Sequence, residues 1–209
     1  DRLAAASLDG QRRIIQQAIQ YSNERKQFGV SISTFGAIRK KVAEMATLHF
    51  VSESGTYRAA KNIEDKIAQF IEEGMTHQQA ELKGVEEFAV ECSILKVFVS
   101  DATQHIADEG IQIYGGMGFS EDAPMEAAWR DSRISRIYEG TNEINRLLAV
   151  GMLIKRAMKG HLDLISPAME VGKELMGIPS FEVPDYSEYM SEEKAIIANL
   201  KKVFLMVSG

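Results

Sequence analysis

Three short segments of this 209-residue chain combine residue types that could take part in chemistry. The most informative is Ile137–Ile144, in which the carboxylate of Glu139 is followed by Gly140 and then by Thr141. Thr141 or Asn142 is a natural N-cap, so a helix that begins here would hold Glu139 at its N-terminal end, in a non-helical turn. Such a turn can hold a carboxylate rigidly against a ligand, although an ordinary loop ahead of a helix has the same signals.

The second segment, Glu24–Gly29, places two cations at the expected end of a helix. Arg25 and Lys26 are favoured there by the helix macrodipole, which gives a purely structural explanation. The functional alternative is a phosphate clamp, because an arginine presents a fixed fork of donors to anionic oxygens. These residues alone are compatible with both explanations.

The third segment, Gln112–Phe119, has glycines at positions 115, 116 and 118. A dinucleotide-binding fingerprint would need a preceding strand and a helix that opens after the glycines, and neither is indicated. The glycines instead predict the C-terminal end of a helix, with backbone that a ligand can approach closely.

The elements that must position these segments are helical. Apolar residues recur at helical spacing and predict long helices over about 2–26, from 35 to 64 or beyond, and over 85–115 and 142–159, with a short helix around 125–131. The polar stretch 65–83 is predicted to be a turn with helical pieces, in which Thr76 and Gln79 have capping-box spacing. Four long stripes without a convincing strand predict an all-α fold, an antiparallel four-helix bundle.

The character of the sequence changes after Gly160. Prolines at 167, 179 and 184 indicate a linker, and a further helix is predicted from Ser191 through Val207. We therefore expect a helical-bundle domain over 1–160, followed over 161–209 by a linker and the truncated start of a further helical domain. The first residues resemble the inside of a helix, so we expect the chain to be part of a longer protein.

Composition excludes several classes of function. The net charge of −6 gives no basic footprint for nucleic acid, and the single Cys92 excludes an internal disulfide framework. No apolar run approaches the length of a membrane span. The four histidines are scattered and predict no metal site, and neither a Gly-x-Ser-x-Gly motif nor the position of Cys92 indicates a nucleophile.

Together the three segments resemble signatures of the acyl-CoA dehydrogenase family, in the family's order and at about its spacing. Glu24–Gly29 resembles its Arg-x-x-Phe-Gly segment, and Gln112–Phe119 resembles its Gln-x-x-Gly-Gly-x-Gly-Phe segment. Arg130-Asp131 and then Ile137–Ile144 resemble its Arg-Asp…Tyr-Glu-Gly-Thr-x-x-Ile segment. The resemblance covers 1–160, which is similar to the family's C-terminal four-helix domain. The tail after 160 is similar to the very-long-chain branch, whose members have an extra helical domain.

This resemblance implies an FAD-dependent enzyme that oxidises fatty acyl-CoA to trans-2-enoyl-CoA. Glu139 occupies the position of the base that removes the α-proton, while the β-hydrogen leaves as hydride to FAD. Tyr138 and Gly140 flank the substrate position. The positions implied to bind the cofactor are Arg25, Gln27, Phe28, Gln112, Gly116, Thr141 and Glu143. Several relatives have glutamine where this chain has Glu143.

The resemblance also implies partners. These are a fatty acyl-CoA substrate, an electron-transferring flavoprotein and a second copy of the chain, because the family's FAD site is shared in a homodimer or higher homo-oligomer. A peripheral membrane contact through the C-terminal extension is a further expectation. The implied compartment is the cytoplasm of a bacterium or, in a eukaryote, the mitochondrial matrix.

Without the family's N-terminal and β domains, the 209 residues alone are expected to be inactive and to bind FAD poorly. Two alternatives stay open. One is an enzyme similar to acyl-CoA oxidase, which passes electrons to oxygen. The other is a non-catalytic helical module for oligomerisation or membrane docking, and its support is the amphipathic tail after Ser191.

Overall fold

The computed structural model describes residues 2–177 and 186–208, and the chain divides into two compact units, Asp1–Val150 and Gly151–Gly209. The described residues of the first unit form five α-helices and the start of a sixth. The five are α1 (Arg2–Glu24), α2 (Gly36–Glu72), α3 (His77–Glu87), α4 (Ala89–Tyr114) and α5 (Pro124–Arg133), and the division falls within α6 (Asn142–Met158). Short 3-10 helices η1 (Ile32–Thr34), η2 (Gly115–Phe119) and η3 (Ile134–Arg136) join them. The predicted all-α class is confirmed.

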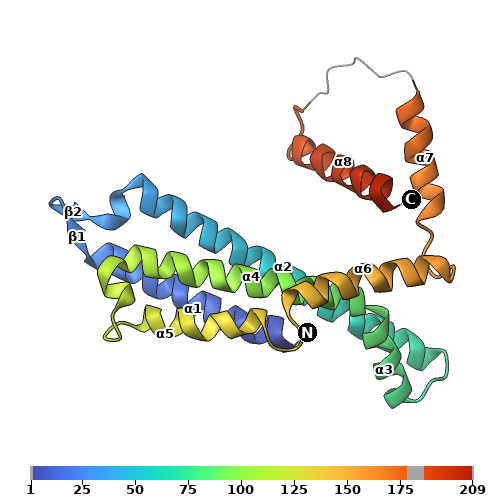
Figure 1. The fold of residues 1–209 in the computed structure, drawn as a ribbon, viewed down its shortest axis with the longest axis horizontal. Coiled ribbons are helices and arrows are strands. Elements are labelled where there is room, and N and C mark those ends of the chain that lie inside the picture. Colours follow the sequence, from blue (N-terminus) through green and yellow to red (C-terminus); the bar gives the residue numbers. More distant parts are fainter. Residues whose placement is uncertain (1, 178–185, 209) are drawn as a thin grey trace. The chain divides into compact units, whose positions relative to one another are not determined.

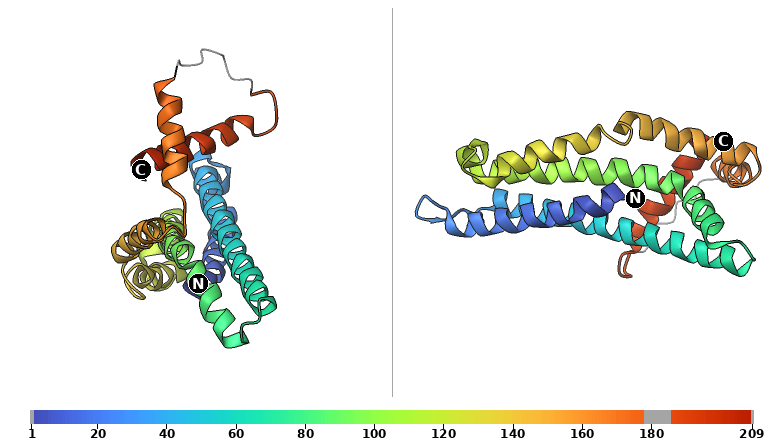
Figure 2. Two further views of the ribbon diagram at one scale, coloured as in Figure 1. Left: turned by 90° about the vertical axis from the view of Figure 1, so that its right-hand side faces the viewer. Right: turned by 90° about the horizontal axis from the view of Figure 1, so that it is seen from below.

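The helices of the first unit form an up-and-down bundle. Helices α1, α2, α4 and α5 run in alternating directions beside one another (Figure 1). From below, α4 and α5 form one layer and α1 and α2 the other (Figure 2, right). After α5 the chain passes through η3 and the turn that contains Glu139 into α6. The helical structure is therefore interrupted between α5 and α6, and Glu139 lies in that interruption.

A small hairpin lies at one end of the bundle. Strands β1 (Lys26–Gln27) and β2 (Val30–Ser31) pair antiparallel around Phe28 and Gly29, which have φ of +53° and +83°. Helix α1 therefore ends at Glu24 instead of continuing to 26 as predicted. A glycine and a non-glycine residue that both adopt the left-handed region are typical of tight hairpin turns.

The core of the first unit holds α5 in place. Its buried apolar cluster draws residues from α1, α2, α4 and α5, namely Ile14, Ile15, Ala18, Met45, Ile106, Ala107, Ile113 and Met125. Complete burial of an isoleucine or methionine side chain stabilises the fold by about 1.5–3 kcal/mol. A Cβ added at Gly110 of α4 would lie 2.9 Å from the Met125 sulfur and 3.0 Å from Ile14 Cγ2, so three helices meet closely there. This packing fixes the direction in which the chain enters the Glu139 turn.

The stretch 65–83 is more helical than predicted. Helix α2 continues to Glu72, and only 73–76 separate it from α3. Apolar residues recur at helical spacing in 65–72, at Ile67, Phe70 and Ile71. Ile67 is half-buried against α3, where a Cβ added at Gly84 would lie 2.5 Å from its Cγ1. The capping box is confirmed, because the Thr76 hydroxyl accepts from Gln79 N–H and the Gln79 side chain accepts from Thr76 N–H, both at 3.4 Å. Helix α4 begins at Ala89, after Phe88 leaves helical geometry, and not at 85.

The second unit contains the remainder of α6, α7 (Ile165–Met176) and α8 (Ser191–Ser208). The helix predicted from Ser191 is confirmed, whereas α7 was interpreted as linker because Pro167 lies in it. Proline is tolerated in the first turn of a helix, and Pro167 is the third residue of α7. Pro179 and Pro184 lie outside the described residues. In residues 2–177 and 186–208, no helix is both long and apolar enough to span a membrane.

Candidate functional site

The turn that contains Glu139 has an unusual backbone. Glu139 has φ +53° and Gly140 has φ +82°, so two successive residues adopt the left-handed region. For a residue with a side chain this conformation costs about 1–2 kcal/mol, and the surrounding structure must enforce it. The Glu139 side chain is exposed. The turn thus presents a carboxylate on a defined, non-helical backbone.

Two side chains hold this turn by its carbonyl oxygens. Asn145 Nδ2 donates to the carbonyls of Gly140 at 2.9 Å, Thr141 at 3.2 Å and Glu139 at 3.4 Å. Lys96 Nζ, from α4, donates to the Gly140 carbonyl at 2.7 Å. Both side chains are buried, at 8% and 4% exposure. The carbonyls therefore face the protein while the Glu139 side chain faces outward.

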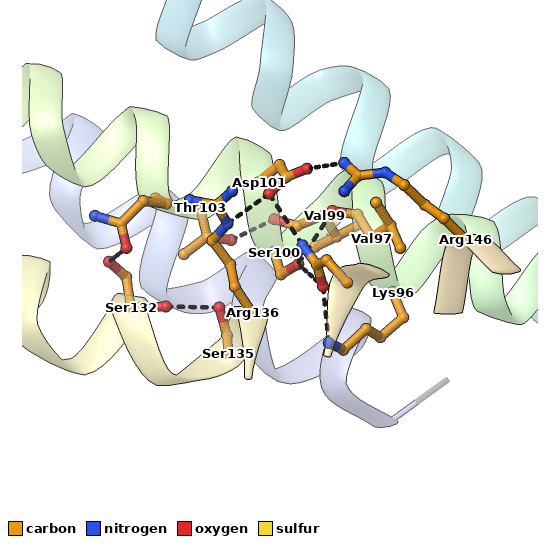
Figure 3. Close-up of polar contacts among 12 residues, drawn as sticks. Lys96, Val97, Val99, Ser100, Asp101, Thr103, Ser132, Ser135, Arg136 and Arg146 are labelled. Atoms are coloured by element: carbon orange, nitrogen blue, oxygen red, sulfur yellow. Dashed lines mark hydrogen bonds and ion pairs between the residues drawn. The ribbon is translucent and has the colours of Figure 1, made fainter. Parts of the chain in front are cut away.

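A group of polar residues around the turn forms what we call the anchoring cluster: Lys96, Ser100, Asp101, Arg136, Asn142 and Arg146 (Figure 3). Its centre is the Asp101 carboxylate of α4, which pairs with Arg136 at 2.7 Å and with Arg146 at 2.9 Å. These two arginines stand on either side of the turn, in η3 and in α6. Asp101 thus ties both flanks of the turn to one helix.

The first residue of α6 completes the cluster. The Asn142 side chain is buried, and its Nδ2 donates to Ser100 Oγ at 2.9 Å and to Asp101 Oδ1 at 3.0 Å. Its Oδ1 accepts from Lys96 Nζ at 2.8 Å. Thr141 acts as the cap, since its hydroxyl accepts from Ile144 N–H at 3.3 Å. Buried polar groups satisfied in this way hold one arrangement of the chain.

Burial lowers the pKa of Lys96. Desolvation lowers the pKa of its ammonium from the ordinary value of 10.5, and the nearby carboxylates of Glu139, Asp101 and Glu143 oppose that change. A buried cation persists when acceptors and opposite charges surround it. Lys96 has both.

The pKa of Glu143 is lowered from its ordinary value of 4.5. Its own backbone N–H is the largest cause, followed by the Thr141 hydroxyl and the charges of Arg146 and Arg136. A carboxylate in the first turn also interacts favourably with the helix macrodipole. The start of α6 therefore favours negative charge.

This environment predicts a pH-dependent stability difference for Glu143→Gln. Because the folded-state pKa lies below 4.5, the ionised carboxylate stabilises the fold above that pH. The contribution is lost as pH falls through the lowered pKa. We expect Glu143→Gln to decrease Tm slightly at neutral pH, and thermal scans of both proteins at decreasing pH to converge. A Tm difference that persists in acid would contradict this assignment.

A cavity of about 450 Å³ adjoins the turn through Tyr138. Its walls come from α1, α4, α5 and η3, and its polar lining includes Arg13, Thr103, Asp131 and Ser132. Tyr138 is 47% exposed and immediately precedes Glu139. Space for a small organic group therefore exists beside the residue next to the carboxylate.

The residues of the other two sequence segments gather at one end of the bundle (Figure 1). Arg25, Gln27 and Phe28 lie exposed at the hairpin, and Phe28 is 87% exposed. The exposed Gln112 and Gly116 lie at the end of α4. Stacking of Tyr21 on Tyr114, with ring centroids 4.0 Å apart, joins the end of α1 to the end of α4.

The structure separates that group from the Glu139 turn. Tyr138, Glu139, Gly140, Thr141 and Glu143 lie beyond the opposite end of α5, a helix of 10 residues. At 1.5 Å per residue, α5 alone is about 15 Å long. The predicted site residues of one chain therefore form two groups.

Sequence reasoning missed the residues that support the turn. Lys96, Ser100 and Thr103 follow one another at spacings of four and three, a polar stripe on α4 that could have been noticed beside the apolar one. The apolar residues of α6 recur at helical spacing but do not form a buried face in this chain. Ile144, Leu147 and Leu148 are 55%, 75% and 49% exposed. Asn142 and Asn145 occupy the buried side instead.

Comparisons with known proteins agree on one family. Residues 2–153 match the family model described as acyl-CoA dehydrogenase, C-terminal domain. The chain is 39% identical over 208 residues to a probable acyl-CoA dehydrogenase of Bacillus subtilis (strain 168), covering 100% of this chain and 35% of that protein. It is 36% identical over 178 residues to the human mitochondrial very long-chain specific acyl-CoA dehydrogenase, covering 85% and 22%.

Among solved structures, an acyl-CoA dehydrogenase complexed with FAD from Bacillus anthracis matches with a TM-score of 0.88 and 36% identity. That match covers 99% of this chain and 34% of the other. The chain thus spans about a third or less of the length of these relatives.

Proposed function

We infer a function from one premise: the chain belongs to the acyl-CoA dehydrogenase family, whose C-terminal domain it matches over residues 2–153. We propose that it is one domain of a longer FAD-dependent enzyme that oxidises fatty acyl-CoA to trans-2-enoyl-CoA. The observation that carries the proposal is the turn held by Lys96 and Asn145, in which Glu139 directly follows Tyr138, a residue that lines the cavity.

Glu139 is proposed to remove the α-proton of the thioester. A positioned carboxylate can accept a proton from a carbon acid, and it becomes a stronger base when apolar surroundings replace water. The Glu139 side chain is exposed in this chain, so a bound acyl group and the other domains of the enzyme would supply that exclusion of water. The carbonyl contacts of Asn145 and Lys96 keep the base in place while the proton moves.

The residues present suit FAD. Arg25 is an exposed fork of donors for anionic oxygens, and the N-terminal end of α6 with Thr141 favours an anion. A Cβ at Gly116 would have nothing within 4 Å, so the backbone there is open to a ligand. The cofactor, when bound, would accept the β-hydrogen as hydride. We propose that Arg25, Gln27, Phe28, Gln112, Gly116, Thr141 and Glu143 hold it.

We also propose that the cofactor site is shared between two copies of the chain. Its proposed residues lie in two groups at opposite ends of α5, which suits one group serving the FAD of its own subunit and the other that of a partner. The exposed apolar side chains of Ile144, Leu147 and Leu148 on α6 give further surface for assembly.

An electron-transferring flavoprotein is the proposed acceptor. The proposed compartment is the cytoplasm in a bacterium or the mitochondrial matrix in a eukaryote; relatives include a bacterial and a mitochondrial protein. A peripheral membrane contact through the second unit stays a prediction, for which the exposed Leu200 and Val207 of α8 give apolar surface.

The proposal is tested by comparing the full-length enzyme with the isolated 209 residues. We expect the full-length protein to be yellow, to lose flavin absorbance when palmitoyl-CoA is added without oxygen, and to form the trans-2-enoyl product. The isolated chain should fold, with helical circular dichroism, yet bind little FAD and form no product, because it lacks about two thirds of its relatives' length.

Two results would contradict this account. A full-length protein whose flavin is not reduced by any fatty acyl-CoA would overturn the proposed reaction. A yellow, active 209-residue chain would overturn the proposed dependence on other domains. Peroxide formation in place of flavoprotein reduction would favour the oxidase-like alternative.

A further inference from the structure

We propose that Lys96 is a positioning residue for Glu139, because it fixes the Gly140 carbonyl from inside the bundle and so sets the direction in which the Glu139 side chain leaves the turn. The inference rests on the proposed role of Glu139 as base. It concerns a residue of α4 that lies 44 positions before Gly140 in the sequence.

The contact geometry carries the inference. Lys96 is 4% exposed, and its Nζ lies 2.7 Å from the Gly140 carbonyl and 2.8 Å from Asn142 Oδ1. A charge-assisted hydrogen bond is about twice as strong as a neutral one. One ammonium therefore connects the residue that follows the base to the first residue of α6.

The turn needs such a restraint. Glycine populates several backbone regions with similar ease, so Gly140 alone would let the peptide beside Glu139 rotate. Glu139 itself adopts φ +53°, which a free chain would seldom adopt. The Lys96 contact selects one orientation of the Gly140 carbonyl. Asn145 supports the same carbonyl from α6, at 2.9 Å.

Lys96 also contributes its charge. The carboxylates that face it are Asp101 on its own helix, Glu139 in the turn and Glu143 in the first turn of α6. Arg136 and Arg146 face the same cluster and are paired with Asp101. A positive charge inside this cluster favours the ionised form of a nearby carboxylate. Replacing Lys96 with an uncharged residue would therefore remove the charge that offsets these carboxylates.

The test is Lys96→Met in the full-length enzyme, with rapid-mixing measurements of flavin reduction by palmitoyl-CoA. We expect the limiting reduction rate to fall by about 10- to 100-fold with little change in KM, because small misplacements of a reacting group can cost that much.

Lys41→Met is the matched control. Lys41 of α2 pairs with Glu109 of α4, and both side chains are largely buried. Its loss removes a comparable internal charge from the same bundle without touching the turn. We expect a lower Tm, an unchanged limiting reduction rate and an unchanged KM. Equal rate losses in the two variants would overturn the positioning role, as would a Lys96→Met enzyme with the wild-type rate.

A second variant covers the case in which Lys96→Met does not fold. Lys96→Arg keeps the charge and the hydrogen-bond donors but changes the distance at which they lie from α4, so its limiting reduction rate should fall. A wild-type rate in Lys96→Arg, with Lys96→Met unfolded, would overturn the proposal. Glu139→Gln distinguishes the proposed role of Glu139 from that of Lys96. If flavin is reduced at the wild-type rate in Glu139→Gln, Glu139 is not the base. If only the Lys96 variants contradict our expectation, Glu139 remains the proposed base and Lys96 does not position it.

Discussion

Replacing Glu139 with glutamine should lower the rate of flavin reduction by acyl-CoA about 10²- to 10⁴-fold in the full-length enzyme, the range that a positioned general base contributes. Glutamine has nearly the same shape but its amide cannot take up the α-proton. The substitution keeps a side chain of equal length on the same φ of +53°, and the carbonyl contacts of Asn145 and Lys96 involve only backbone of the turn. KM and Tm should therefore change little.

Two further variants make that result specific. Glu64→Gln removes an exposed carboxylate from α2, and its reduction rate should equal that of the wild type. Glu139→Asp keeps a carboxylate but shortens its reach, so its rate should lie between those of the wild type and Glu139→Gln. Flavin reduction by Glu139→Gln at the wild-type rate would remove Glu139 from the mechanism.

The Glu139 turn could be predicted from sequence because its signals are local. A glycine tolerates φ +82°, a threonine caps the next helix through Ile144 N–H, and both facts follow from residue type within a few positions. The start of α6 at Asn142 was predicted for the same reason. Capping and turn preferences of this kind depend on neighbouring residues in the sequence and not on how the helices pack.

The anchoring cluster could not be predicted in the same way. Lys96 and Asn142 are 46 positions apart, and their contact depends on how α4 and α6 pack. Lysine is rarely fully buried, so residue type argues against Lys96 as an interior side chain. On α6 the apolar spacing favours Ile144 and Leu147 as the packed side, yet the asparagines are buried because they hold the turn. In this chain the hydrogen bonds of the turn, rather than the apolar spacing, determine which side of α6 is buried.

A similar limit applies to the helices. The second long helix was predicted to reach 64 or beyond, and α2 continues to Glu72. Helix α7 was interpreted as linker because Pro167 lies in it, although a proline in the first turn need not end a helix. The long core helices were predicted because their buried residues, such as Ile14 and Ile106, recur at helical spacing.

Gly118→Ala is expected to be strongly destabilising. A Cβ at this buried glycine would lie 2.5 Å from the Ile111 carbonyl oxygen and 2.9 Å from Ile111 Cα, both backbone atoms of α4. Backbone in a packed helix cannot move aside as a flexible side chain can. Overpacking typically costs 1–3 kcal/mol, and we expect about 3 kcal/mol here. For a chain of this length that corresponds to a decrease in Tm of roughly 6–12 °C.

Gly116→Ala, two residues earlier in η2, is the matched control. A Cβ there would have nothing within 4 Å. The free energy of unfolding should therefore change by less than about 0.5 kcal/mol, and Tm should stay near that of the wild type. Thermal unfolding of both variants, followed by circular dichroism, compares them directly. Equal Tm values would mean that η2 shifts away from α4 without a loss of stability.

In the full-length enzyme, Gly116→Ala should still weaken FAD binding, because the proposed approach of the cofactor to this backbone leaves no room for a methyl group. A stable Gly116→Ala enzyme with unchanged FAD affinity would therefore remove Gly116 from the cofactor site while leaving the role of Gly118 in the fold untouched.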